Sequence, residues 1–315
     1  MSSFDLSAGN RFLDLDRLES EAADSGGRDL DRLGTAELAA MMNAADATVP
    51  ALVGHALPQI TAAIDAIAAG LAAGGRLIYV GAGTPGRLGV LDASECPPTF
   101  DSPADQVQGH IAGGPVAVTD AIEGAEDDDA AGAALMDELA VGGNDAIVGI
   151  SASGRTPYVV GALLAARRRG AVTATIVNTS SSELAAVVEF PIEVVTGPEI
   201  ITGSTRLRAG TAQKLVLNML STITMVKLGK TLGNLMVDVR TSNAKLRARA
   251  VRIVSLATGL EPGAARELFD RAGRETKTAI AAGLTGLAVD DARAELTAAS
   301  GHLREVLDQH GVDVP

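Results

Sequence analysis

The sequence predicts an α/β fold: a doubly wound parallel sheet with helices on both faces, preceded by an N-terminal helical segment and followed by a small C-terminal helical domain. The first observation is a series of short apolar runs, which alternate with helical patterns along the chain. The second is composition, because 47% of the 315 residues are hydrophobic but only 2% are aromatic. Such mainly aliphatic content is typical of a sheet covered by helices.

The predicted strands are short runs rich in β-branched residues. They comprise residues 76–80, 108–114, 145–150, 171–178 and 190–195. The acidic stretch 121–140 is predicted to continue into a helix before the third of these strands. Ligands of such folds bind where the strands end, so the loops after these strands are the candidate binding segments.

Helical patterns lie before the first and after the last of the predicted strands along the chain. One helix is predicted from near Pro50 to the Gly74–Gly75 pair, and one long helix over 203–229 closes the sheet domain. Charged, Ala-rich helical patterns then cover 242–258, 263–285 and 289–309. We therefore expect an N-terminal helical segment (1–65), a sheet domain (66–230) and a helical domain (240–315).

Charge and composition exclude several classes of function. A net charge of −13 and few aromatic residues argue against nucleic acid as a partner. No apolar run reaches the roughly 18 residues that a membrane span needs, and the first residues lack a secretory pattern. The chain has a single cysteine, Cys96, so no disulfide within the chain is predicted. Its four histidines are not spaced in pairs as metal ligands often are, so no metal site is predicted either. We expect a cytoplasmic protein that uses no metal or other cofactor.

The segment GAGTPGR (81–87) has glycines at the G-x-G-x-x-G spacing of dinucleotide-binding turns. That motif also needs an acidic residue about 20 positions further on, at the end of the next strand. Residues 96–106 contain three prolines there, which an interior strand does not tolerate. A phosphate loop of the G-x-x-x-x-G-K-[ST] type is excluded as well, because Arg87 follows Gly86. The glycines alone are a weak signal.

A second loop, SASGRT (151–156), shares the design of the first. Each offers backbone N–H groups and hydroxyls at the start of a helix, which suits a phosphate monoester bound by an acidic protein. The alternative is that Ser153 and Thr156 only cap a helix and that the glycines only allow a tight turn. The two loops together favour a phosphate site.

These loops belong to a longer set of segments that resembles the SIS (sugar isomerase) domain family, and more closely the N-acetylmuramic acid 6-phosphate etherases within it. The segments are 76–100 (RLIYVGAGTPGRLGVLDASECPPTF), 111–114, 121–128, 150–160, 197–222 and 233–239. The resemblance implies a flavodoxin-like, SIS-type sheet. It also implies a homodimer with sites near the shared interface.

The activity that the resemblance implies is that of a lyase in peptidoglycan amino-sugar recycling. N-acetylmuramic acid 6-phosphate would be split into N-acetylglucosamine 6-phosphate and D-lactate. In the open-chain sugar the C1 aldehyde acidifies the C2 proton, so lactate can leave C3 by elimination, and water then adds. This chemistry needs one acid and one base, and two carboxylates in different environments can serve.

By matching motifs, Glu95 would be the acid that protonates the departing oxygen, and Glu126 would be the base at C2. Glu123, expected on the same helical face as Glu126, would position the sugar. Residues implied to bind substrate are Thr84, Gly86, Arg87, Ser94, Glu123, Ser151, Ser153, Gly154, Arg155, Thr156 and Ser204.

From the residues alone, other interpretations remain open. Glu95 would be a helix-end carboxylate and Glu126 a member of the exposed acidic run 126–129. Arg87 and Arg155 would be surface or subunit-contact arginines, and we expect Cys96 to be a buried side chain and not a nucleophile.

Two segments depart from the family pattern on the ligand side. Pro85 stands where the family usually has Ser, and residues 178–182 replace a common Asn-Pro-Gly-Ser turn. A non-catalytic sugar-phosphate-binding regulator is the second hypothesis, because the glucokinase regulatory protein resembles the same domain, although it is a much longer chain with two SIS domains. A sugar-phosphate isomerase ranks third, because it does not account for the segment around Glu95.

Overall fold

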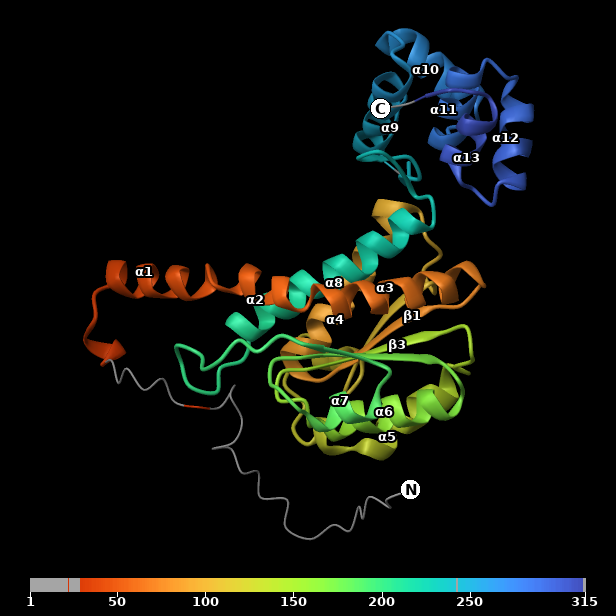
Figure 1. Cartoon of the computed structure of the whole chain (residues 1–315). Coiled ribbons are helices and arrows are strands. Elements are labelled where there is room, and N and C mark those ends of the chain that lie inside the picture. The colour runs from red at the N-terminus through yellow and green to blue at the C-terminus, as the bar shows by residue number, and fades with distance from the viewer. Residues whose placement is uncertain (1–21, 23–28, 242, 314–315) are drawn as a thin grey trace.

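The structure, a computed structural model, describes residues 22, 29–241 and 243–313. Within them, five strands form one parallel sheet in the order β2-β1-β3-β4-β5 (Figure 1). The strands are β1 (Leu77–Gly81), β2 (Val107–Ile111), β3 (Ala146–Ser151), β4 (Val172–Val177) and β5 (Phe190–Glu193). Each matches a predicted strand with small shifts at its ends, and the doubly wound α/β fold is confirmed.

Helices cover both faces of this sheet (Figure 1). One face carries α3 (Leu57–Ala72), α4 (Gly83–Phe100) and α8 (Arg208–Lys227), and the other carries α5 (Asp129–Glu138), α6 (Pro157–Arg168) and α7 (Glu183–Val187). The predicted helix over 121–140 is therefore correct only from Asp129 onward.

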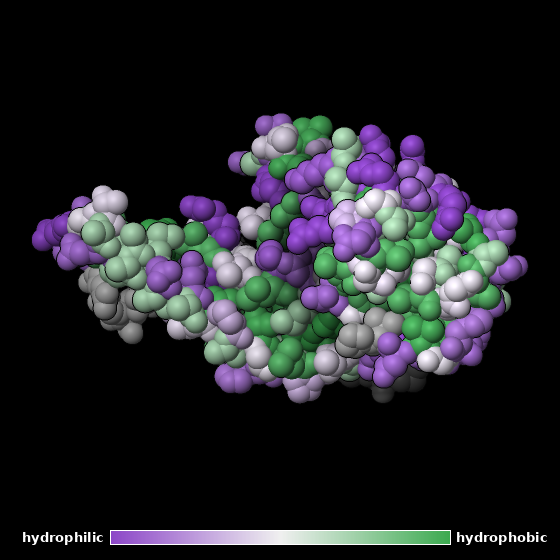
Figure 2. Space-filling model, turned by 90° about the horizontal axis from the view of Figure 1, so that it is seen from above, coloured by the Kyte–Doolittle hydropathy of each residue, from purple (hydrophilic) through white to green (hydrophobic). Residues whose placement is uncertain are grey.

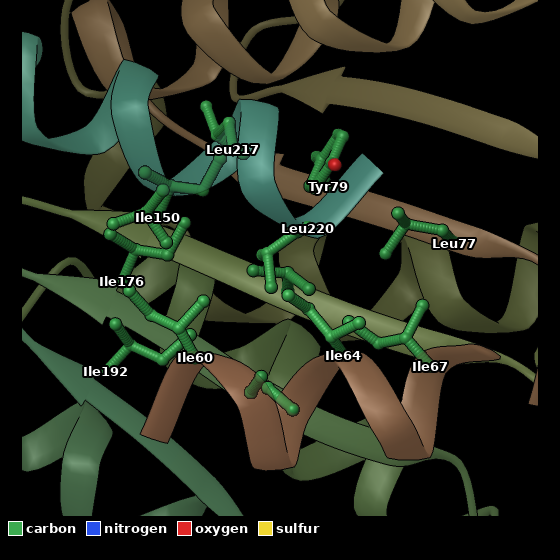
Figure 3. Packing of buried hydrophobic residues seen from close by; sticks show 14 of the residues in the cluster. Ile60, Ile64, Ile67, Leu77, Tyr79, Ile150, Ile176, Ile192, Leu217 and Leu220 are labelled. Carbon is green, nitrogen blue, oxygen red and sulfur yellow. The ribbon is translucent and has the colours of Figure 1, made fainter. Parts of the chain in front are cut away.

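The core under α3 and α8 is built from branched aliphatic side chains (Figure 3). Ile60 and Ile64 of α3 pack with Ile150 and Ile176 of the strands and Leu220 of α8. Neighbouring strand residues point to opposite faces, and both faces are buried, which is why the strands appear in the sequence as continuous apolar runs. Full burial of one such side chain contributes about 1.5–3 kcal/mol.

The N-terminal helical region is not one helix from Pro50, as predicted, but two. Helix α2 (Val49–His55) and helix α3 are separated at Ala56, and the chain direction bends by 62° there. Pro58 is in the first turn of α3, where its missing N–H costs no helical hydrogen bond, so it favours a new helix start. Helix α1 (Thr35–Asp46) precedes them, and residues 1–21 and 23–28 of the predicted segment lie outside the described residues.

We compared the length and apolarity of the described helices with what a membrane span needs, and one pair of helices meets those criteria together. No single one has the length and apolarity to cross a membrane, and only the bent pair Thr35–His55 with Leu57–Ala72 meets those criteria jointly.

After the sheet, a short antiparallel hairpin leads into a helical unit with its own core, built around residues such as Phe269 and Leu307. Its elements are β6 (Thr231–Leu232), β7 (Leu235–Met236), α9 (Ala244–Thr258), α10 (Pro262–Arg271), α11 (Thr276–Thr285), α12 (Val289–Ala298) and α13 (Leu303–Gln309). The helical patterns predicted over 263–285 and 289–309 are each broken in two. The breaks coincide with positive φ values at Arg274 and Ser300, next to glycines.

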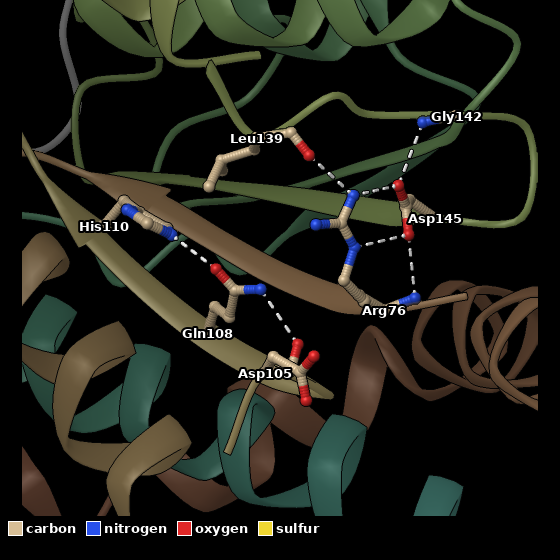
Figure 4. A network of polar contacts seen from close by, with 7 residues as sticks. All are labelled: Arg76, Asp105, Gln108, His110, Leu139, Gly142 and Asp145. Atoms are coloured by element: carbon tan, nitrogen blue, oxygen red, sulfur yellow. Dashed lines mark hydrogen bonds and ion pairs between the residues drawn. The ribbon is translucent and has the colours of Figure 1, made fainter. Parts of the chain in front are cut away.

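An ion pair ties the start of β1 to the start of β3 (Figure 4). The Arg76 guanidinium donates from Nη2 (2.7 Å) and Nε (3.0 Å) to the Asp145 carboxylate, which also accepts from the backbone N–H groups of Arg76 and Gly142. Burial alone would raise the pKa of Asp145, but these hydrogen bonds outweigh it and hold the pKa below its ordinary value.

We expect Asp145→Asn to lower the free energy of unfolding by about 1–3 kcal/mol at pH 7, because it leaves Arg76 without its anionic partner. Since the folded-state pKa of Asp145 is depressed, its contribution is present above the unfolded pKa of about 4 and is lost as pH falls through the folded pKa. Urea unfolding at pH 7 and near pH 3 measures both effects. Asp65→Asn, in an exposed pair with Lys227, is the control and should cost less than about 0.5 kcal/mol. An equal loss at both pH values would contradict the role of the Asp145 charge.

Candidate functional site

The first predicted loop is shorter than expected, because α4 begins at Gly83 directly after β1. Thr84, Gly86 and Arg87 therefore lie in the first turns of the helix. A Cβ on Gly86 would come within 2.8 Å of the Gly81 carbonyl oxygen, and one on Gly81 within 2.7 Å of the Gly86 nitrogen. The glycine spacing is thus explained by the close packing of a helix on its strand.

The two predicted loops meet at one place in the sheet. Strands β1 and β3 are neighbours, with Gly81 opposite Ile150, and the helices that follow them cover opposite faces. A strand order of 2-1-3-4-5 has its topological switch point between β1 and β3, where ligands of open α/β sheets bind. Residues 81–87 and 151–156 accordingly share this edge.

Hydroxyls of the second loop are bonded to one another. The buried Ser151 Oγ accepts from the Gly154 N–H at 3.0 Å and lies 2.8 Å from Thr156 Oγ1 and 3.4 Å from Ser153 Oγ. Gly154 has φ +68°, and a Cβ there would come within 2.3 Å of Ser182 Cβ. Thr156, at the N-cap of α6, makes no side-chain cap hydrogen bond, because its hydroxyl is bonded to Ser151 Oγ instead. Arg155 is half-buried and makes no hydrogen bond to a described residue.

A cavity of about 350 Å³ opens beside the first loop. It is lined by Gly83 and Arg87 of α4 and by residues of the segment 117–126, including Glu123 and Glu126. Arg87 fixes this segment: Nε donates to the Val118 carbonyl (2.8 Å), and Nη2 donates to the carbonyls of Ala117 (2.9 Å) and Asp120 (3.0 Å). Its Nη1 group has no partner among the described residues.

The prediction that Glu123 and Glu126 share a helical face is wrong. Glu123 lies in a turn, Gly124 follows with φ +74°, and Glu126 is in a short 3-10 turn, η4 (Ala125–Asp127). Helix α5 starts only at Asp129, because Asp128 caps it by accepting from the Ala131 N–H. Both carboxylates are exposed and reach the same cavity by way of this turn.

Glu95 lines a different cavity, of about 200 Å³, between α4 and α8. Lys214 and Asn218 of α8 and Asp92 of α4 line it as well. Ser94, next to Glu95, is exposed and donates to the Leu91 carbonyl at 2.8 Å. In a single chain, the two predicted catalytic carboxylates therefore face separate cavities.

Asp92 is a buried carboxylate that joins three elements under this second cavity. It accepts from Tyr79 Oη of β1 (2.9 Å) and, in α8, from Asn218 Nδ2 (2.8 Å) and Ser221 Oγ (3.2 Å). Burial raises the pKa of Asp92 above its ordinary value, although these hydrogen bonds oppose the shift. Burial also raises the pKa of the neighbouring Cys96 thiol to about 12, which disfavours the thiolate that a nucleophile needs.

The helix predicted from residue 203 begins at Arg208, and Ser204 lies in a preceding turn that lines neither cavity. The reason is Glu199, a buried carboxylate that the sequence analysis missed. It accepts from the N–H groups of Arg208 (3.0 Å) and Ala209 (2.9 Å) and so satisfies the start of α8. An acidic residue upstream of a helix is a signal of such a cap, but its separation from the helix start hid it here.

Metal ligands are absent from this geometry: the part of the chain that the structure describes has no group of three or more His, Cys, Asp or Glu side chains placed to hold an ion.

The family model of the glucokinase regulatory protein N-terminal SIS domain matches residues 59–167, which include β1, β2, β3 and both loops, so this part of the chain is similar to the class of SIS-domain proteins. N-acetylmuramic acid 6-phosphate etherases from Rubrobacter xylanophilus and Streptomyces coelicolor are each 56% identical to the chain, over 91% and 93% of it and 95% and 94% of their own lengths. The chain therefore belongs to the N-acetylmuramic acid 6-phosphate etherase family. A solved phosphoheptose isomerase from Neisseria gonorrhoeae overlays 61% of this chain and 99% of its own, with a TM-score of 0.46 and 16% identity.

We expect Arg87→Ala to loosen the segment that carries Glu126, because three carbonyls lose their charged donor. Hydrogen exchange should speed up about tenfold or more at the amides of residues 117–126 and stay unchanged in β1 and β3. Arg155→Ala is the control and should leave both regions as they are. Unaltered exchange over 117–126 in Arg87→Ala would show that this contact does not hold the segment.

Proposed function

We propose that this chain cleaves the D-lactyl ether of N-acetylmuramic acid 6-phosphate, giving N-acetylglucosamine 6-phosphate and D-lactate. Its family membership, over nearly its full length, supports the reaction. The structural observation that carries the proposal is Glu126 lining a cavity beside the first loop, together with Arg87 and the start of α4. We place this activity in the cytoplasm, in the recycling of peptidoglycan amino sugars.

The reaction divides into an elimination and an addition. Glu126 takes the C2 proton of the open-chain aldehyde, the electron pair forms the C2–C3 double bond, and the C3–O bond breaks as Glu95 gives its proton to the ether oxygen. Glu95 is then a carboxylate and takes a proton from a water molecule while the oxygen of that water adds to C3. Glu126 returns the proton to C2. General acid and general base catalysis of this kind each contribute about 10²–10⁴-fold.

The 6-phosphate would lie against the first turn of α4 and the second loop. The N–H groups in the first turn of a helix attract anions, and the first turn of α4 holds Thr84 and Gly86, although the Gly86 N–H also donates to the Ala82 carbonyl. Arg87 follows, and its Nη1 has no partner among the described residues. Ser94, Ser151, Ser153, Gly154, Arg155, Thr156, Glu123 and Ser204 remain the other proposed binding residues. Pro85 is in the first turn of α4, where its missing N–H costs no helical hydrogen bond.

We further propose that the working enzyme is a homodimer whose sites combine both chains. Glu95 and Glu126 line separate cavities in one chain, so a second copy is needed to bring an acid to the base. Helix α1 buries none of its residues within the chain and projects from the body as an arm (Figure 2). A helix of this length is marginal in water without packing, so a second copy packed against it would stabilise it.

The regulator hypothesis is not favoured. A non-catalytic regulator would bind the sugar phosphate without releasing lactate, and the relatives that the chain matches over almost its whole length carry an enzyme's name. An isomerase would also remove the C2 proton, but it has no use for an acid at C3.

Glu95→Gln should reduce lactate release by about 10²–10⁴-fold and leave exchange of the C2 proton with solvent intact, because only the acid is lost. Glu126→Gln should reduce both. Enzymatic assay of D-lactate and mass spectrometry of the sugar in deuterated water measure these outcomes, and Glu138→Gln, at an exposed position of α5, is a control expected to keep both. Unchanged exchange in Glu126→Gln would remove Glu126 as the base.

Mixing the two inactive variants tests the shared site. If each site takes Glu95 from one chain and Glu126 from the other, half of the randomly paired dimers are mixed, and each has one intact site, so about a quarter of the activity returns. If both residues act within one chain, no mixed dimer has an intact site and activity stays absent. The mixture is assayed after unfolding and refolding together, with each variant refolded alone as the reference.

A further inference from the structure

The cavity around Glu95 has a composition that suits a small anionic group with an apolar part. Leu88, Leu91 and Leu217 supply an apolar wall, and Lys214 is the cation that lines it. At about 200 Å³ it is smaller than the roughly 300–1,000 Å³ of pockets that enclose a whole small molecule, so it fits a portion of a substrate.

Lys214 forms no ion pair within the described residues, although its charge acts on the Asp92 carboxylate and opposes the rise in the pKa of Asp92. It lines the same cavity as Glu95, yet the two side chains form no ion pair. Asp92, the other carboxylate of the cavity, is buried, and its oxygens accept from Tyr79, Asn218 and Ser221. The exposed Lys214 side chain thus lines the cavity with no hydrogen-bond partner among the described residues, one helical turn from Asn218.

We infer that Lys214 binds the carboxylate of the lactyl group while Glu95 protonates the ether oxygen. The inference rests on the proposed function and adds the group that recognises the leaving half of the substrate. In a lactyl ether the carboxylate carbon is two bonds from the ether oxygen, so an acid at that oxygen is necessarily close to a second negative charge. When Glu95 gives its proton to the ether oxygen it becomes a carboxylate beside the lactyl carboxylate, and a cation next to both offsets that repulsion. The three leucines accommodate the lactyl methyl group.

Two substrates and two lysine variants test this subsite. The substrates are N-acetylmuramic acid 6-phosphate and its lactamide analogue, in which a neutral amide replaces the carboxylate. Release of N-acetylglucosamine 6-phosphate, the product common to both, is measured. Wild-type enzyme should have a kcat/KM about 10- to 100-fold higher for N-acetylmuramic acid 6-phosphate than for the lactamide analogue, which is the value of a charge-assisted hydrogen bond.

Lys214→Ala should lower kcat/KM for N-acetylmuramic acid 6-phosphate by that same factor and leave kcat/KM for the lactamide analogue unchanged, so the preference between the two substrates disappears. Lys214→Arg should keep most of this preference, because it retains the positive charge. Lys227→Ala is the matched control, because this lysine of α8 pairs on the surface with Asp65 and should leave both values as in wild type.

The outcomes separate the two proposals. If wild-type enzyme releases the sugar product from the acid but Lys214→Ala retains the full preference for the acid, the subsite is wrong and the proposed function stands. If wild-type enzyme releases product from neither substrate, the proposed function fails and the subsite with it.

Discussion

The close packing of α4 against β1 is the constraint on which both cavities depend. Three glycines, Gly81, Gly86 and Gly89, remove the side chains that would separate helix from strand. A Cβ on Gly89, for example, would come within 2.9 Å of Tyr79 Cβ. With the helix held this close, its two sides become the walls of two cavities. One side directs Arg87 toward the segment 117–126, and the other directs Asp92 and Glu95 toward α8.

Asp92 and Arg87 hold the two sides of α4 to neighbouring elements in different ways. Arg87 is partly exposed and holds backbone carbonyls of an otherwise irregular segment, so that contact orders a loop. Asp92 is buried and takes donors from β1 and α8, so it fixes how α8 sits across α4. A buried carboxylate is costly unless its oxygens are satisfied, and three donors offset that cost here. The Glu95 side of α4 is therefore held by buried hydrogen bonds, and the Glu126 side depends on a loop.

The strands and the two loops were predictable from the sequence because they depend on local signals. β-branched runs buried on both faces leave a clear pattern, and each is followed by Gly, Ser and Thr. Helix ends were less predictable because distant groups decide them. The start of α8 depends on Glu199, and the split of α10 from α11 depends on a positive φ at Arg274. The resemblance to a family singled out Glu95 and Glu126, but their separation in space depends on the packing of α4, which no local pattern reveals.

An acidic protein that binds an acidic substrate must place positive groups where the anions of the substrate lie. A net charge of −13 matters little at the site if the charges lie more than about 8–10 Å away in physiological salt, because they are screened. What counts is the local supply: the Nη1 group of Arg87 and the first turn of α4 near one cavity, and Lys214 at the other. A substrate with a phosphate at one end and a carboxylate on its leaving group carries two anions well apart from each other. Two separated positive positions, with Glu95 beside one and Glu126 beside the other, match that charge pattern better than a single basic cluster would.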